Sequence, residues 1–185
     1  MKGIIFNLLE EVVATHLDER TWDGILDSTG AKGAYTSLGN YPDEEFVRLL
    51  GALSQQSGKS DRETLKWFGQ LSMPFLAQRY PEFFSPHTGM RSFLLSLNDV
   101  IHAEVRKLYP GAEVPNFEFE TPTGAAAQDT LIIHYRSKRR LCQLAEGFIA
   151  GAADHFGEKI TVTQPRCMLE GANACALVCR FQQRD

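Results

Sequence analysis

The residue with the most specific chemistry in this 185-residue chain is a histidine inside its longest apolar helical pattern. On a helical projection His102 lies within about 20° of Leu95 and Tyr109 and about 60° of Val105, so it borders the apolar stripe. An imidazole there needs a partner for each ring nitrogen. Iron on one nitrogen, with a carbonyl or carboxylate on the other, is one solution. A hydrogen-bonded core histidine is the alternative, and it is the commoner outcome for an isolated histidine.

A second set of polar groups occupies the segment Tyr-Arg-Ser-Lys-Arg at residues 135–139. In an extended segment residues i, i+2 and i+4 share a face, so Tyr135, Ser137 and Arg139 can converge on one anionic group. A phenol, a hydroxyl and a guanidinium match a carboxylate well. The alternative is that Tyr135 is an ordinary strand residue, Ser137 caps the following helix and Arg139 is solvated.

The cysteines form a third candidate site, because all four lie in the last quarter of the chain. Cys142, Cys167 and Cys175 could bind zinc, since thiolates are soft ligands. Their spacing is not a standard Cys-x-x-Cys pair, so unligated thiols and a redox role stay open as alternatives. The sequence contains no phosphate loop, no Gly-x-Ser-x-Gly elbow and no paired carboxylates at catalytic spacing, and we therefore expect a protein that is not an enzyme.

The elements that must hold these side chains change type along the chain. Apolar residues recur at helical spacing in the first half, and alternating patterns follow a Pro-Gly pair at residues 110–111. The longest pattern predicts one continuous helix from Arg91 to Tyr109. In order, the predicted elements are helices near residues 5–13, 43–54 and 62–75 (with Asp61 as N-cap), the helix 91–109, strands near 117–119 and 130–135 joined by a turn over 121–126, a helix capped by Ser137 and reaching Phe156, and strands at 159–164 and 175–181.

This order of elements predicts an α+β fold, with a mainly helical N-terminal part and a C-terminal four-stranded antiparallel sheet that carries one packed helix. The length fits a single domain over residues 1–185, divided into a helical subdomain of about residues 1–60 and a second subdomain of about residues 61–185. A net charge of −4 and a pI near 5.7 argue against binding to nucleic acid or an anionic membrane. We find no signal peptide or membrane span and expect a cytoplasmic protein.

Taken together, the motifs resemble those of one family. An opening Met-Lys-Gly-Ile-Ile-Phe, the helix segment Asp-Val-Ile-His at residues 99–102, then Pro115 and Tyr-x-Ser-x-Arg at residues 135–139 are similar to the H-NOX (haem-nitric oxide/oxygen-binding) family along essentially the whole chain. The resemblance implies haem b between the two subdomains, with His102 as axial iron ligand. It also implies that the propionates bind to Tyr135, Ser137 and Arg139, and that Ile5 and Pro115 press on the macrocycle. The chain has no covalent attachment motif for haem.

The resemblance also bears on which gas is bound. Oxygen-binding members have a tyrosine five residues after the motif arginine, and this chain has Leu144 there, with apolar Leu76 at another pocket position. Bound oxygen gains from a hydrogen-bond donor, whereas nitric oxide on ferrous iron needs little such help. The sequence therefore predicts a nitric oxide sensor, unless another polar group, such as Ser72, reaches the iron.

The implied mechanism is that nitric oxide weakens the bond between iron and His102, and that the resulting shift regulates a separate histidine kinase or cyclic-di-GMP enzyme. Some relatives complete a zinc site with a histidine at the position of Gln164, so here His155 or Cys179 would have to substitute. A zinc or thiol redox-sensing interaction module on the same fold is the alternative function.

Overall fold

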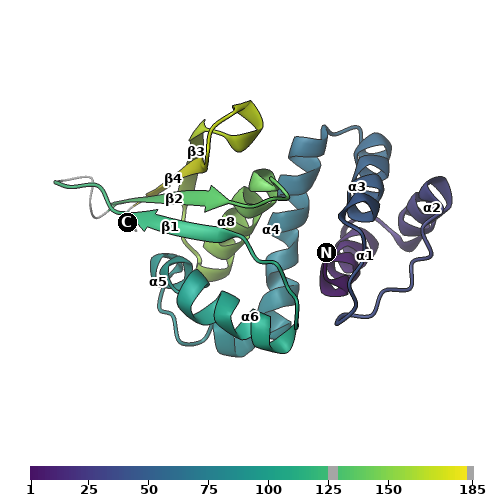
Figure 1. Ribbon diagram of the computed structural model, residues 1–185, viewed down its shortest axis with the longest axis horizontal. Helices are drawn as coiled ribbons and strands as arrows, with labels where there is room; N and C mark the ends of the chain where they lie inside the picture. Colours follow the sequence, from purple (N-terminus) through teal and green to yellow (C-terminus); the bar gives the residue numbers. More distant parts are fainter. Residues whose placement is uncertain (125–128, 183–185) are drawn as a thin grey trace.

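The computed structural model describes residues 1–124 and 129–182 of the chain. Its main elements are the helices α1 (Gly3–His16), α2 (Glu19–Thr29), α3 (Asp43–Ser57), α4 (Asp61–Arg79), α5 (Met90–Leu95), α6 (His102–Leu108) and α8 (Cys142–Phe156), and the strands β1 (Asn116–Glu120), β2 (Thr130–Arg136), β3 (Ile160–Arg166) and β4 (Cys175–Phe181). Helices α1, α2 and α3 lie together on one side of α4, and the sheet, α5 and α6 lie on the other side (Figure 1). The predicted α+β fold is confirmed.

The sheet has the order β1-β2-β4-β3, and every neighbouring pair is antiparallel. Strand β2 alternates as the sequence predicted, with Leu131, Ile133 and Tyr135 buried. Among the strands of the described residues, β1 pairs only with β2, so it forms one edge of the sheet. In the register, Phe117 of β1 lies opposite Tyr135.

Helices α4 and α8 pack closely because glycines stand at their crossing. A Cβ added to Gly147 would lie 2.3 Å from the carbonyl oxygen of Lys66, and one added to Gly69 would lie 2.6 Å from the carbonyl oxygen of Leu144. Only residues without a side chain allow the two backbones to approach this far. The crossing fixes the position of Leu144 on α8 relative to α4.

The continuous helix predicted from Arg91 to Tyr109 is wrong. The structure divides this stretch into α5, a π-helical turn η2 (Leu97–Ile101) and α6. The Ser96 hydroxyl donates to the Phe93 carbonyl at 2.7 Å, and the Ser96 carbonyl accepts from the amides of both Val100 and Ile101. A serine that competes for backbone groups loosens a helix in this way, and π turns of this kind are frequent at functional sites.

Two predicted helix caps are also wrong. The N-cap of α4 is Ser60, which forms a capping box with Glu63 and leaves Asp61 inside the first turn. Ser137 does not cap α8, because Arg140 adopts a left-handed φ of 51° and the helix begins only at Cys142. The Ser137 hydroxyl instead accepts a hydrogen bond from the Arg139 amide at 3.2 Å.

The remaining differences concern element boundaries. Helix α2 was not predicted, because only Trp22 and Ile25 of its residues are buried. Helix α4 continues past Pro74 to Arg79, beyond the predicted end at residue 75. The turn predicted over residues 121–126 lies partly outside the described residues. Within the described residues, no helix has the length and apolarity needed to cross a bilayer.

Candidate functional site

A cavity of about 330 Å³ lies among α1, α4, α6, α8 and the first two strands. The residues that the sequence singled out for cofactor binding all line it: Ile5, Leu76, His102, Pro115, Tyr135, Ser137, Arg139 and Leu144. These residues come from distant parts of the chain, so the structure brings them together around one space. Its volume falls at the lower end of the range for ligand pockets, about 300–1,000 Å³.

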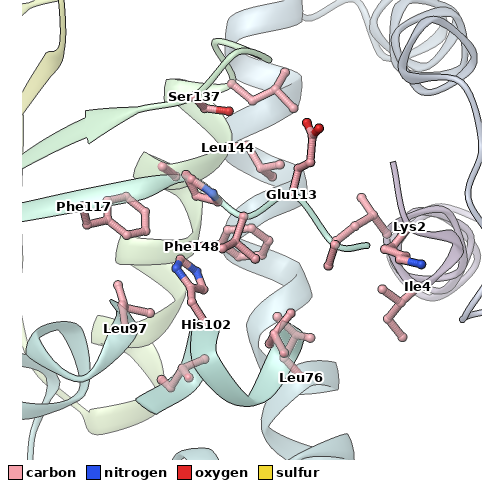
Figure 2. Close-up of a pocket in the computed structure, with 18 of the residues that line it drawn as sticks. Lys2, Ile4, Leu76, Leu97, His102, Glu113, Phe117, Ser137, Leu144 and Phe148 are labelled. Carbon is pink, nitrogen blue, oxygen red and sulfur yellow. The ribbon is translucent and has the colours of Figure 1, made fainter. Parts of the chain in front are cut away.

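His102 is the first residue of α6, and its side chain extends into the cavity toward the side where Phe117 and Phe148 lie (Figure 2). The imidazole stacks on the Phe117 ring, with 5.5 Å between ring centroids and 24° between ring planes. Its Nδ1 atom is buried and has no hydrogen-bond partner among the described residues. The carbonyl or carboxylate partner expected for this nitrogen is therefore not found there.

Burial also sets the protonation state of His102. Burial, together with the smaller effect of the nearby positive charge of Arg106, lowers the pKa of His102 to about 4. The imidazole is thus neutral at physiological pH, which is the form that binds metal ions. A neutral imidazole in an apolar cavity would be suited to hold a haem iron.

The part of the cavity formed by α4 and α8 is apolar. Leu76 of α4 and Leu144 and Phe148 of α8 line it (Figure 2). Ser72 does not line the cavity, and its hydroxyl donates to the Phe68 carbonyl at 2.7 Å. The polar group that could have reached a bound gas from this position is therefore engaged within its own helix.

The rim of the cavity carries the polar residues of the Tyr-x-Ser-x-Arg motif. Tyr135 is buried, and burial raises its pKa to about 12, so its phenol keeps its proton and can donate. The Arg139 guanidinium donates from Nε to Asp43 Oδ2 and from Nη1 to the Glu113 carbonyl, both at 2.8 Å. A guanidinium has five N–H donors, so Arg139 has donors beyond these two hydrogen bonds with which to bind an anionic haem substituent.

The sequence did not reveal Asp43 as a residue of this site, although it correctly predicted that a helix begins at Asp43. Its other carboxylate oxygen lies 2.7 Å from the Met1 amino group, so Asp43 connects α1 and α3 to Arg139. Burial alone would raise the pKa of Asp43, but the hydrogen bonds and positive charges of Met1 and Arg139 outweigh it and hold this pKa below its usual value.

The three cysteines of the third candidate site meet inside the protein. The sulfur atoms of Cys142, Cys167 and Cys175 all lie within 4.8 Å of one another, and the first two are 3.7 Å apart. Burial raises the pKa of Cys142 to about 12. Neither residue considered as a fourth ligand joins this group: His155 packs on the rings of Phe84 and Phe156, and Cys179 contacts the Leu177 carbonyl. The Gln164 amide nitrogen is buried without a hydrogen-bond partner among the described residues.

Comparisons with known proteins agree with this geometry. Residues 2–164 match the family model described as Haem-NO-binding. The chain is similar to an H-NOX protein from S. oneidensis in the Fe(II)NO ligation state, with 32% identity, a TM-score of 0.91, and coverage of 99% of this chain and 100% of that one. A triple mutant of an H-NOX protein from S. oneidensis in the Fe(II) ligation state gives 31% identity and a TM-score of 0.92, over 100% of this chain and 98% of that one.

An unliganded Fe(II) H-NOX protein from K. algicida matches at 26% identity and a TM-score of 0.86, over 100% of this chain and 98% of that one. Among curated proteins, no significant match is found. The family model covers most of the chain, and the structural matches extend over all or nearly all of it. The chain therefore belongs to the Haem-NO-binding (H-NOX) family.

Proposed function

We propose that this chain is a nitric oxide sensor, not an enzyme, that holds haem b between its two subdomains, residues 1–60 and 61–185. One observation carries the proposal: a neutral, partly buried His102 shares a cavity with an α4–α8 wall that is apolar. Haem iron, when bound, would supply the coordination position for a diatomic gas and a bond to His102 that gas binding can weaken. His102 would hold the iron, and Tyr135, Ser137 and Arg139 would bind the propionates.

The choice of gas follows from the apolar wall. Leu76, Leu144 and Phe148 have no side-chain donor, and the hydroxyl of Ser72 is already used within α4. Bound oxygen carries partial negative charge and would find no donor on this wall, whereas nitric oxide needs little such stabilisation. The H-NOX protein from S. oneidensis whose Fe(II)NO structure matches this chain supports the same choice.

Signal output would begin at the cavity rim. Arg139 is bound to Asp43, which in turn contacts the Met1 amino group, so a displacement of the motif would move α1 and α3. Ile5 and Pro115 line the cavity from α1 and from the segment before β1, and both would press on a bound macrocycle. The partner regulated by this shift would be a separate histidine kinase or cyclic-di-GMP enzyme. A ligand can drive such a shift only by favouring one of the two conformations.

Visible absorption of the purified protein tests this function. We expect a strong Soret band that shifts when nitric oxide is added to the reduced protein and does not change when the reduced protein meets air. A reduced protein that forms a stable oxygen complex would contradict the proposed gas choice. A colourless protein that carries stoichiometric zinc would instead support the alternative, a zinc or thiol redox module.

The thiol cluster supports a second, separate proposal, that Cys142, Cys167 and Cys175 bind zinc. Zinc binds cysteine as the thiolate, so it would displace the thiol protons to solvent as it binds. Metal analysis after zinc loading should give one ion per chain in the wild type and none in Cys167→Ser. Cys179→Ser is the matched control, because Cys179 lies outside the cluster, and it should retain the ion.

A further inference from the structure

The π turn before His102 carries an asparagine that binds the backbone of a strand. The Asn98 side-chain amide donates to the Phe117 carbonyl, and the Asn98 Oδ1 atom accepts from the Phe117 amide at 3.3 Å. One side chain thus satisfies both backbone polar groups of one residue. Phe117 lies in β1, an edge strand, whose outer side has no neighbouring strand in the part of the chain that the structure describes. Asn98 takes the place that a strand would otherwise fill.

The position of Asn98 depends on the π turn. Asn98 is the second residue of η2, and His102 follows directly after the turn. Asn98 and His102 are therefore part of one short segment, held at its start by Ser96 and attached through Asn98 to the sheet. Removal of the Asn98 amide would leave this segment without its hydrogen bonds to β1.

The residue that Asn98 holds is also the one that contacts the imidazole. The Phe117 ring stacks on the His102 imidazole. It also contacts the Tyr135 ring, at a centroid distance of 5.7 Å. The His102 Nδ1 atom has no hydrogen-bond partner among the described residues. A histidine ligand is usually oriented by a hydrogen bond at this nitrogen. Here the aromatic contact is the interaction seen to orient the ring.

We propose that Asn98 is a positioning residue, which fixes the Phe117 ring and through it the orientation of His102 toward the iron. This inference rests on the proposed function, because it assumes that His102 binds iron. The proposal assigns to Asn98 and Phe117 the role that a hydrogen-bonded carbonyl or carboxylate has at other metal-bound histidines. No contact between Asn98 and the haem is required.

The test compares Asn98→Ala with Asn7→Ala, which also removes one amide hydrogen bond (to Ser37, at 3.0 Å) but lies on α1. The iron–histidine stretching band of the ferrous protein should shift and broaden in Asn98→Ala and stay unchanged in Asn7→Ala. Haem affinity should fall on the order of 10-fold in Asn98→Ala, which is the usual effect of removing a group that orients a metal ligand. Asn98→Asp keeps the acceptor for the Phe117 amide and should give an intermediate shift.

A free ligand separates an effect through Phe117 from an effect through the π turn. In a His102→Gly protein supplied with imidazole, the ligand is no longer attached to the π turn but still meets the Phe117 ring, so adding Asn98→Ala should still shift the iron–imidazole band. An unchanged band in this background would overturn the proposal, as would an unchanged band when His102 is present. If Asn98→Ala does not fold, Asn98→Asp decides in the same way.

A haem-free readout distinguishes this proposal from the proposed function. In the haem-free protein, the ring-current shift of Phe117 on the His102 protons should be lost in Asn98→Ala and kept in Asn7→Ala. If no haem binds but this NMR result holds, the proposed function fails while the link between Asn98 and His102 stands. If haem binds normally and the ring-current shift persists in Asn98→Ala, the positioning role is wrong and the sensor function remains.

Discussion

Replacing Leu144 with tyrosine should convert this protein into one that holds oxygen. Leu144 is buried and lines the cavity, so the tyrosine hydroxyl would enter an apolar space with no competing acceptor among the α4 and α8 side chains described above. A hydrogen bond to a charged or partly charged acceptor contributes about 1.5–3 kcal/mol. Since 1.4 kcal/mol is a factor of 10 in an equilibrium constant, oxygen should bind on the order of 10- to 100-fold more tightly.

Leu144→Phe is the matched control, because it adds the same ring without the hydroxyl. Both variants enlarge a buried side chain, so each should lose about 1–3 kcal/mol of stability through overpacking. The difference between them isolates the hydrogen bond. Nitric oxide affinity should change similarly in both variants.

Stopped-flow measurement of oxygen dissociation from the reduced proteins gives the result directly. Slow dissociation in Leu144→Tyr, and no detectable oxygen complex in Leu144→Phe or the wild type, is the expected outcome. The reasoning fails if wild type already holds oxygen, or if the phenylalanine and tyrosine variants release it at the same rate.

Three further predictions concern stability and reactivity. Gly147→Ala should lower the free energy of unfolding by about 1–3 kcal/mol, because the added Cβ would lie 2.3 Å from a backbone oxygen. Gly51→Ala is the control and should be neutral or stabilising, since its added Cβ would have nothing within 4 Å. Equal melting temperatures for the two variants would disprove the close helix crossing. The pKa of Asp43 is lowered in the folded protein, so its contribution to stability is present above the ordinary pKa of 3.8 and is lost as the pH falls through the folded value. Denaturant midpoints at pH 6 and pH 3 should therefore show the wild type losing its advantage over Asp43→Asn on acidification, and a constant difference would contradict this. With a pKa of about 12, the thiolate fraction of Cys142 at pH 8 should be roughly one in ten thousand. Alkylation of Cys142 should therefore be slow until the protein unfolds, and rapid labelling of the native protein would show that the thiol is not buried.

Much of the architecture could be predicted because its signals are local. The alternation in β2 and the apolar spacing in α8 are set by residues two to four positions apart, which a sequence shows directly. The resemblance then selected eight residues, and all of them line one cavity. That they bind haem remains a proposal.

The features that the sequence could not reveal depend on distant partners. Arg139 pairs with Asp43 across 96 positions, and nothing near either residue indicates the other. The π turn arises where Ser96 and Asn98 bind backbone groups instead of continuing the helix, and Asn98 finds its partner only once β1 is in place. The cap at Ser60 instead of Asp61 is a shift of one residue between two good capping types, which propensity alone does not resolve.

Titration of haem into the haem-free protein tests the central claim most directly. We predict a Soret band that saturates at one haem per chain, and a His102→Ala variant whose ferrous spectrum lacks the histidine-ligated form. A wild-type protein that takes up no haem, or a His102→Ala variant with the same ferrous spectrum as the wild type, would contradict the assignment of His102 as the iron ligand.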